Sequence, residues 1–167
     1  MIAPRELARF DEFVETSSDR LVRTAYLLCG DRGHAEDIAQ TALMRTARRW
    51  AVAKEQPEAY ARKVVVNLVK DRWRHLNRRP AELPLEVDVE MPSSTAELDR
   101  DVLLRAALAL PKGQRTILVL RFFEDLSVED TAACLGVTAG TVKSQTSRAL
   151  DSLRATLNPL QEHAHAD

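Results

Sequence analysis

The chain has 167 residues, a formal net charge of −1 and 45% hydrophobic residues, which is enough apolar material for a packed core and excludes a wholly disordered chain. Only 5% of the residues are aromatic and 5 are glycine, so the composition favours helices over a β-sandwich or barrel. Two cysteines, Cys29 and Cys134, are too few for a disulfide framework or a four-thiolate zinc site. We expect both to be buried free thiols.

The sequence contains no predicted targeting or membrane segment. The start, MIAPRELARF, carries charges where a secretory signal peptide needs an apolar stretch. No apolar run approaches the roughly 18 residues of a membrane span. We therefore expect no membrane insertion and a cytoplasmic, reducing location.

Three helices are predicted in the first part of the chain, from apolar residues at helical spacing. Their expected ranges are 5–28, 34–50 and 58–77. Thr16–Asp19 can interrupt the first helix, and a turn with two glycines at 30–33 separates it from the second. Pro57 opens the third helix, where its missing N–H removes no hydrogen bond.

The third helix has a basic face opposite an apolar one. Steps of four, three and four residues place on one face Lys63, Asn67, Lys70 and Arg74, extended by Arg78. The opposite arc carries Ala61, Val64, Val65, Leu68, Val69, Trp73 and Leu76. Lys and Arg neutralise phosphates and Asn hydrogen-bonds base edges, so the basic face predicts nucleic-acid contact. Tyr60 and Trp73 either stack on an unpaired base or pack in the core.

Charge reverses sharply after this helix. Residues 62–79 carry seven basic side chains and one acidic one, whereas residues 80–101 carry seven acidic side chains and one basic one. The acidic stretch also contains three prolines and no helical period, which is typical of a flexible linker. We therefore expect a helical domain over 1–79, an acidic linker over 80–96, a second helical domain over 97–160 and a tail over 161–167.

The second domain shows a helix-turn-helix pattern. Its expected helices are 98–110, 114–123, a helix capped by Ser127 that ends at Leu135, and a last helix that Thr138 can cap and that runs to about Leu157. Ala132 is small where two helices approach, and Val137 and Val142 can fill the junction. The exposed start of the last helix carries Thr138, Thr141, Lys143, Ser144, Ser147 and Arg148. Such a helix reads bases in the major groove, although a three-helix packing without DNA contact has the same pattern.

Two stretches together resemble a bacterial RNA polymerase sigma factor of the extracytoplasmic-function type. YARKVVVNLVKDRWR is similar to the family's helix that recognises and melts the minus-ten promoter element. LPKGQRTILVLRFFEDLSVEDTAACLGVTAGTVKSQTSRALDSLR resembles its minus-thirty-five reader. The resemblance covers about residues 10–155, and the arrangement and composition are similar to those of actinobacterial members.

The resemblance also implies a surface for core RNA polymerase. AEDIAQTALMRTARRW is similar to the family's polymerase-binding helix, with Asp37 and Gln40 at the family's acid-x-x-Gln spacing and Thr41 beside them. The implied partners are core RNA polymerase, promoter DNA and an anti-sigma factor. The implied function is promoter recognition and opening, with no bond chemistry and no cofactor.

Two other functions fit parts of the sequence. A dimeric helix-turn-helix repressor that works without polymerase explains Lys143 and Arg148 but gives Asp37 and Gln40 no role. A nuclease or deaminase needs a metal-ligand cluster, and Asp37, Asp71 or His34 has no second cluster beside it. The sequence therefore predicts no metal site, and the pair His163 and His165 is expected to belong to a disordered end.

Overall fold

The computed structural model describes the backbone of residues 1–78 and 95–164, and the side chains of residues 1–78 and 102–158. Within these ranges every regular element is a helix, which confirms the all-α prediction. The chain divides into two compact units, residues 1–86 and 87–167, and each is described by itself. The expected linker lies outside the described residues except for its last two, which belong to a helix.

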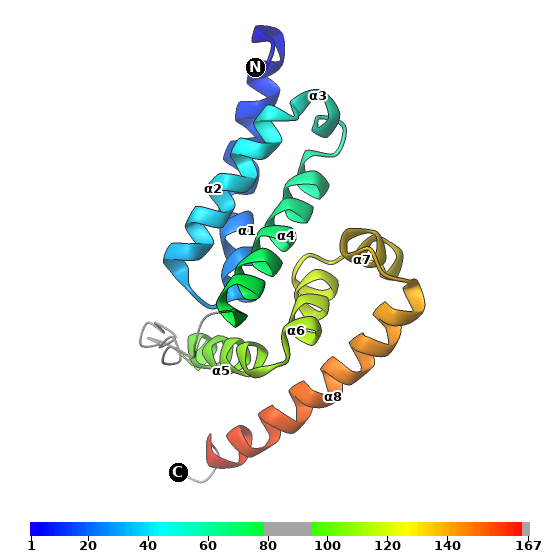
Figure 1. The fold of residues 1–167 in the computed structure, drawn as a ribbon. Helices are drawn as coiled ribbons and strands as arrows, with labels where there is room; N and C mark the ends of the chain where they lie inside the picture. The colour runs from blue at the N-terminus through cyan, green and yellow to red at the C-terminus, as the bar shows by residue number, and fades with distance from the viewer. Residues whose placement is uncertain (79–94, 165–167) are drawn as a thin grey trace. The chain divides into compact units, whose positions relative to one another are not determined.

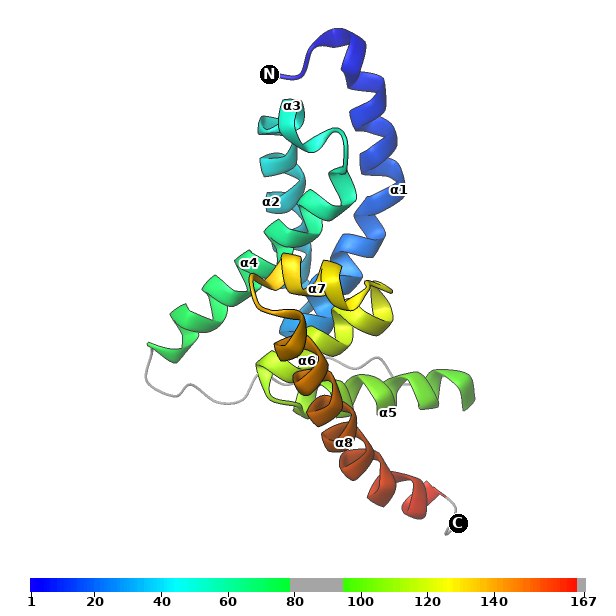
Figure 2. The same ribbon diagram turned by 90° about the vertical axis from the view of Figure 1, so that its right-hand side faces the viewer.

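Unit 1 is a bundle of three long helices with one short helix at its end. Figures 1 and 2 show α1 (Pro4–Cys29), α2 (Arg32–Arg48) and α4 (Pro57–Asn77), with α3 (Trp50–Ala53) leading from α2 to α4. Each long helix packs against the other two. Gly30 takes a left-handed conformation, with φ 73°, and its N–H donates to the carbonyl of Tyr26, so the chain turns sharply between α1 and α2.

The core of unit 1 combines small and branched side chains. Its fully buried members include Ala25, Leu28, Ala35, Ala42, Ala61, Val65 and Val69. Alanines where the helices meet allow close approach of the backbones, and Leu28 with the valines fills the remaining space. The predicted apolar arc of α4 is therefore correct at Ala61, Val65 and Val69.

Three expectations for unit 1 were wrong. Thr16–Asp19 does not interrupt α1, because the Thr16 and Ser18 hydroxyls donate to carbonyls one turn earlier and leave the helix intact. Leu76, expected in the packed arc, is 38% exposed because it lies in the last turn of α4. Val66, absent from the predicted arc, is buried.

The short helix α3 was not predicted and forms around a buried tryptophan. Trp50 is 3% exposed, and its ring meets Phe10 edge-on at 5.2 Å and Phe13 at 6.0 Å between centroids. Aromatic contacts of this geometry add to the free energy gained from burial. These ring contacts hold α3 against the first half of α1. They therefore fix the position at which the connection from α2 to α4, residues 49–56, begins.

The described part of unit 2, residues 95–164, contains five helical elements. They are α5 (Thr95–Ala109), α6 (Lys112–Leu118), the π-helix η1 (Val119–Phe123), α7 (Val128–Leu135) and α8 (Ala139–Ala164). The break before α6 is confined to Leu110 and Pro111, and the π-helical turn replaces the end of the expected helix 114–123. The last helix continues through Pro159 to Ala164 instead of ending near Leu157. A proline removes one backbone donor, and here the chain remains helical on both sides of it.

The helix-turn-helix of unit 2 is confirmed. The Ser127 hydroxyl accepts a hydrogen bond from the Asp130 N–H at 3.0 Å and caps α7, and Gly136 ends it with φ 68°. Val142 is fully buried on α8, whereas Val137, expected to fill the same junction, is 40% exposed. Val137 lies in the turn between the two helices, where its side chain is only partly covered.

The buried side of α8 fixes which residues point outward. Ala149 of α8 packs with Leu110 and Leu118, and Leu150 and Leu153 lie against this cluster. These contacts define the packed side of the last helix. The candidate DNA-reading side chains precede this cluster and are exposed, namely Thr138, Thr141, Lys143, Ser144, Ser147 and Arg148.

Candidate nucleic-acid interface

The basic face of α4 is a surface of the folded chain. Lys63, Asn67, Arg74 and Arg78 are exposed, and Lys70 is half-buried. Val65 and Val69, on the other side of the helix, have no exposed surface. Burial of the apolar side thus holds the cations and the Asn67 amide outward, where they can reach phosphates and base edges.

An ion pair and two aromatic side chains affect what the basic face of α4 can bind. Arg74 and Asp71 form an exposed ion pair at 3.1 Å, so part of the Arg74 charge is neutralised within the helix. Tyr60 and Trp73 are both half-buried, so neither is a fully covered core residue. Tyr60 lies in the first turn of α4, one turn before Lys63, where it can offer one side of its ring to a base.

The predicted polymerase-binding residues lie on α2. Asp37 and Gln40 are exposed, and Thr41 is half-buried. Asp37 and Thr41 also line a hollow of about 350 Å³ together with Leu68 and His75 of α4. The sequence did not predict this hollow, because it joins side chains more than 25 positions apart, from two helices.

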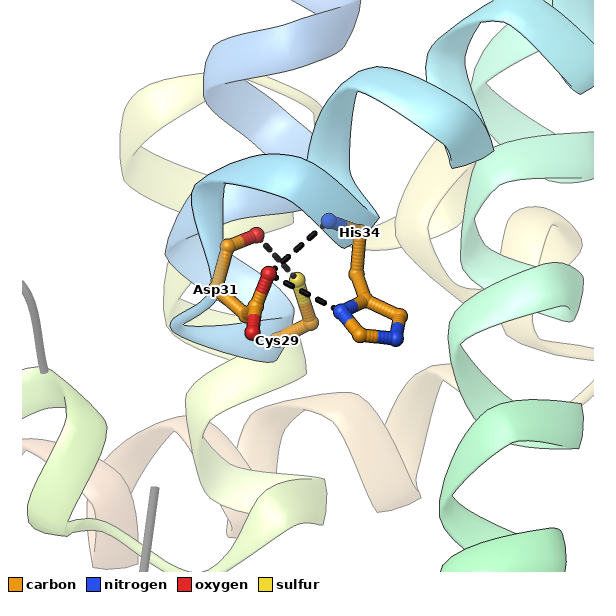
Figure 3. A network of polar contacts seen from close by, with 3 residues as sticks. All are labelled: Cys29, Asp31 and His34. Atoms are coloured by element: carbon orange, nitrogen blue, oxygen red, sulfur yellow. Dashed lines mark hydrogen bonds and ion pairs between the residues drawn. The ribbon is translucent and has the colours of Figure 1, made fainter. Parts of the chain in front are cut away.

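A polar network at the start of α2 orients this surface. Asp31 caps the helix: its carboxylate accepts from the His34 N–H at 2.8 Å and lies 2.9 Å from His34 Nδ1 (Figure 3). The hydrogen bond from the His34 N–H lowers the pKa of Asp31, because it stabilises the ionised carboxylate. A negative charge here also interacts favourably with the positive end of the helix dipole.

Cys29 joins the same network from the end of α1. Its thiol donates to the Asp31 carbonyl at 3.4 Å (Figure 3), and burial raises its pKa. The raised pKa keeps the sulfur protonated at neutral pH, which disfavours reaction. Both cysteines are thiols outside any disulfide among the described residues, as expected, but they are half-buried instead of buried, since each lies near the end of a helix.

The start of α8 is ordered by its own hydroxyl groups. The Thr138 oxygen accepts from the Thr141 N–H at 3.1 Å and lies 2.9 Å from the Thr141 hydroxyl, which confirms Thr138 as the cap. The Ser144 hydroxyl donates to the Thr141 carbonyl at 3.1 Å. These three side chains therefore stabilise the start of α8 by hydrogen bonds and are also exposed on its surface.

Lys143, Ser147 and Arg148 are exposed on α8, but they lie in different surroundings. Lys143 and Ser147 line a hollow of about 340 Å³ with Arg121 and Arg154, and Arg148 is not among its lining residues. Arg121 was missed from the sequence because it lies in an otherwise apolar segment; its Nε is buried without a hydrogen-bond partner among the described residues. The hollow thus places Lys143 and Arg121 beside Ser147, whereas Asp151, which also lines it, pairs with Arg154 at 3.4 Å and offsets part of its positive charge. Its cationic groups can contact a phosphate.

Two further observations concern other kinds of site. Among the residues that the structure describes, no group of three or more His, Cys, Asp or Glu side chains is placed to hold a metal ion. The pair His163 and His165 lies outside the described side chains. No helix in the described part of the chain is long and apolar enough to cross a membrane.

Comparisons with known proteins assign the family. Residues 13–79 match the family model of Sigma-70 region 2, and residues 100–153 match that of Sigma-70, region 4. The RNA polymerase sigma-E factor of Streptomyces coelicolor is 41% identical over 91% of this chain and 88% of its own length. The ECF RNA polymerase sigma factor SigE of Mycolicibacterium smegmatis is 36% identical over 87% of this chain and 60% of its own length.

A solved structure agrees with these relatives. The sigma factor RpoE from Bartonella quintana, in complex with the anti-sigma factor NepR, has 25% sequence identity and a TM-score of 0.73, covering 89% of this chain and 96% of that one. The chain therefore belongs to the sigma-70 family of RNA polymerase sigma factors, in its extracytoplasmic-function group. The resemblance inferred from the residues is thus confirmed.

The Asp31 cap leads to a pH-dependent prediction. Asp31→Ala removes the side-chain acceptor at the start of α2, which should lower the free energy of unfolding by about 1 kcal/mol at pH 7. Because folding lowers the pKa of Asp31, its stabilisation is fully present above the ordinary value of 3.8 and is lost as the pH falls through the folded value. Urea unfolding of both proteins from pH 7 to pH 3 measures this difference.

Asp31→Asn is the matched control, because asparagine is also a good cap but has no titrating charge. It should keep most of the stability at pH 7 and show less change with pH than the wild-type chain. A stability difference between wild type and Asp31→Ala that stays constant down to pH 3 would contradict the role given to the carboxylate.

Proposed function

We propose that this sigma factor uses three separate surfaces to start transcription. The α2 surface of Asp37, Gln40 and Thr41 binds core RNA polymerase. The α4 face of Tyr60, Lys63, Asn67, Lys70, Arg74 and Arg78 holds the opened minus-ten element. The α8 surface of Thr138, Thr141, Lys143, Ser144, Ser147 and Arg148 reads the minus-thirty-five element.

The observation that carries the proposal is the two-sided character of α4. The helix buries a valine side against α1 and α2 and exposes Lys63, Asn67 and Arg74 on the other. A DNA-binding protein that reads only duplex DNA through its helix-turn-helix has no use for this second basic face. A sigma factor needs it, because promoter opening requires contacts to unpaired bases and their phosphates.

The proposal extends to location, partners and domain limits. The chain acts in the cytoplasm, performs no bond chemistry and needs no cofactor. Residues 1–79 bind polymerase and the minus-ten element, 80–96 connect, 97–160 read the minus-thirty-five element and 161–167 form a tail. An anti-sigma factor is a further proposed partner, supported by the solved relative, which is in complex with one.

Transcription with reconstituted polymerase tests the function as a whole. Core polymerase with this protein, given genomic DNA, should produce transcripts from a set of promoters that share two sequence elements. Core polymerase alone should not. A footprint on duplex DNA by the protein without polymerase, and no gain in transcription, would instead support the repressor, which no present observation favours.

Polymerase binding should depend on α2. Asp37→Ala with Gln40→Ala removes an exposed carboxylate and amide one turn apart, so core polymerase affinity should fall by about tenfold or more while the fold is kept. A binding titration and circular dichroism measure the two effects. Glu36→Ala, an exposed neighbour outside the proposed surface, is the control. Equal affinity for all three proteins would remove Asp37 and Gln40 from the interface.

Promoter opening should depend on Asn67. Asn67→Ala should lower permanganate reactivity of promoter thymines, because an amide that pairs with an unpaired base edge is lost. Lys63→Ala should act through phosphates and reduce the salt dependence of binding by about one unit of slope. Reactivity equal to wild type in Asn67→Ala would exclude Asn67 from the minus-ten contact.

The two cations of α8 should differ in effect. Arg148 has the planar guanidinium that suits bidentate contact with guanine, so Arg148→Ala should relax the preference at one or two base pairs by roughly 1–3 kcal/mol. Arg148→Lys keeps the positive charge that Arg148→Ala removes, but it should not restore the preference for these base pairs. Lys143 lies with Arg121 and Arg154, so Lys143→Ala should weaken binding evenly across sequences.

A randomised minus-thirty-five library, transcribed with each variant, separates these effects. The preferred sequence should change only for the Arg148 variants. A changed preference in Lys143→Ala together with an unchanged one in Arg148→Ala would mean that α8 docks on DNA by a different side.

A further inference from the structure

The first turns of α1 hold the connection between α2 and α4. The Lys54 ammonium lies 2.8 Å from Glu6 Oε1, and the Arg9 guanidinium donates to the Lys54 carbonyl at 3.2 Å. The side chains of Lys54 and Glu6 are only 30% and 20% exposed. The hydrogen bond from Lys54 lowers the pKa of Glu6, so this carboxylate is ionised at neutral pH.

Aromatic packing strengthens the same contact. Phe10 and Phe13, which follow Arg9 within α1, pack on the ring of Trp50 at the start of the connection. Figures 1 and 2, seen from two directions, both place the start of α1 at the end of unit 1 where α3 lies. The α1 helix therefore contacts the connection at two points, Trp50 and Lys54.

Backbone hydrogen bonds continue from these two points into α4. The Lys54 N–H donates to the Trp50 carbonyl at 2.9 Å, and the Gln56 N–H donates to the Ala53 carbonyl at 3.0 Å. The Tyr60 N–H then donates to the Gln56 carbonyl at 3.0 Å. A displacement of Lys54 would thus be transmitted to the first turn of α4, where the proposed minus-ten face begins.

We infer that Glu6, Arg9 and Lys54 are positioning residues for promoter opening. They fix the start of α4, and with it Tyr60 and Lys63, in the orientation that meets the opened strand. The inference rests on the proposed function of α4. The α1 helix thus contributes to DNA opening without contacting DNA itself, because its effect is transmitted through Lys54.

A charge-reversal series in the complete holoenzyme tests this role. Glu6→Lys places two like charges together, and Glu12→Lys makes the same change of net charge at an exposed position of the same helix. The readout is permanganate reactivity of thymines in a duplex promoter. Glu6→Lys should lower the reactivity about two- to fivefold, the range expected for a partly exposed ion pair, and Glu12→Lys should match wild type. Lys54→Glu added to Glu6→Lys should restore opening.

Two further measurements separate positioning from general damage. Core polymerase affinity should be the same for Glu6→Lys as for Glu12→Lys, and the melting temperature should fall only slightly, because a partly exposed ion pair contributes little to stability. Equal opening by these two variants would overturn the inference alone. A parallel loss of opening, affinity and melting temperature, without restoration by Lys54→Glu, would also overturn it. No opening even by the wild-type holoenzyme would overturn the proposed function, and the inference with it.

Discussion

Close packing of α1, α2 and α4 through small side chains is the constraint on which unit 1 depends. Ala25, Ala35, Ala42 and Ala61 have no exposed surface, so the three helices meet with little space between their backbones. A helix with one side committed to such an interface has its polar residues fixed on the remainder of its surface. The rotation of α2 and of α4 is therefore set by burial, and their functional side chains follow from it.

This constraint produces two exposed surfaces of different chemistry on one small unit. The α2 surface offers a carboxylate and an amide, which suit a protein partner, and the α4 face offers cations and an amide, which suit nucleic acid. In unit 2, too, burial of one side of a helix determines which of its residues are exposed. Burial of Val142 and Ala149 turns Lys143 and Arg148 outward, and the Thr138 cap fixes where α8 begins.

Local features could be predicted from the sequence, and long-range ones could not. The α4 face and the Thr138 cap depend on residues three or four positions apart, which periodicity and capping rules describe. The contact of Glu6 with Lys54 and the packing of Trp50 on Phe10 and Phe13 depend on residues more than 36 positions apart. Leu76 and Val137 were misplaced because periodicity identifies an apolar side but not whether a neighbour covers it.

The central claim is that α2 and α4 bind different partners. Hydrogen exchange of the chain alone, with core polymerase, and with polymerase and a promoter measures it most directly. Amides of residues 37–45 should become protected when polymerase is added, and residues 57–74 should gain protection only when the promoter follows. Protection of 57–74 and of the start of α8 by promoter DNA without polymerase, with no change at 37–45 on adding polymerase, would contradict the account.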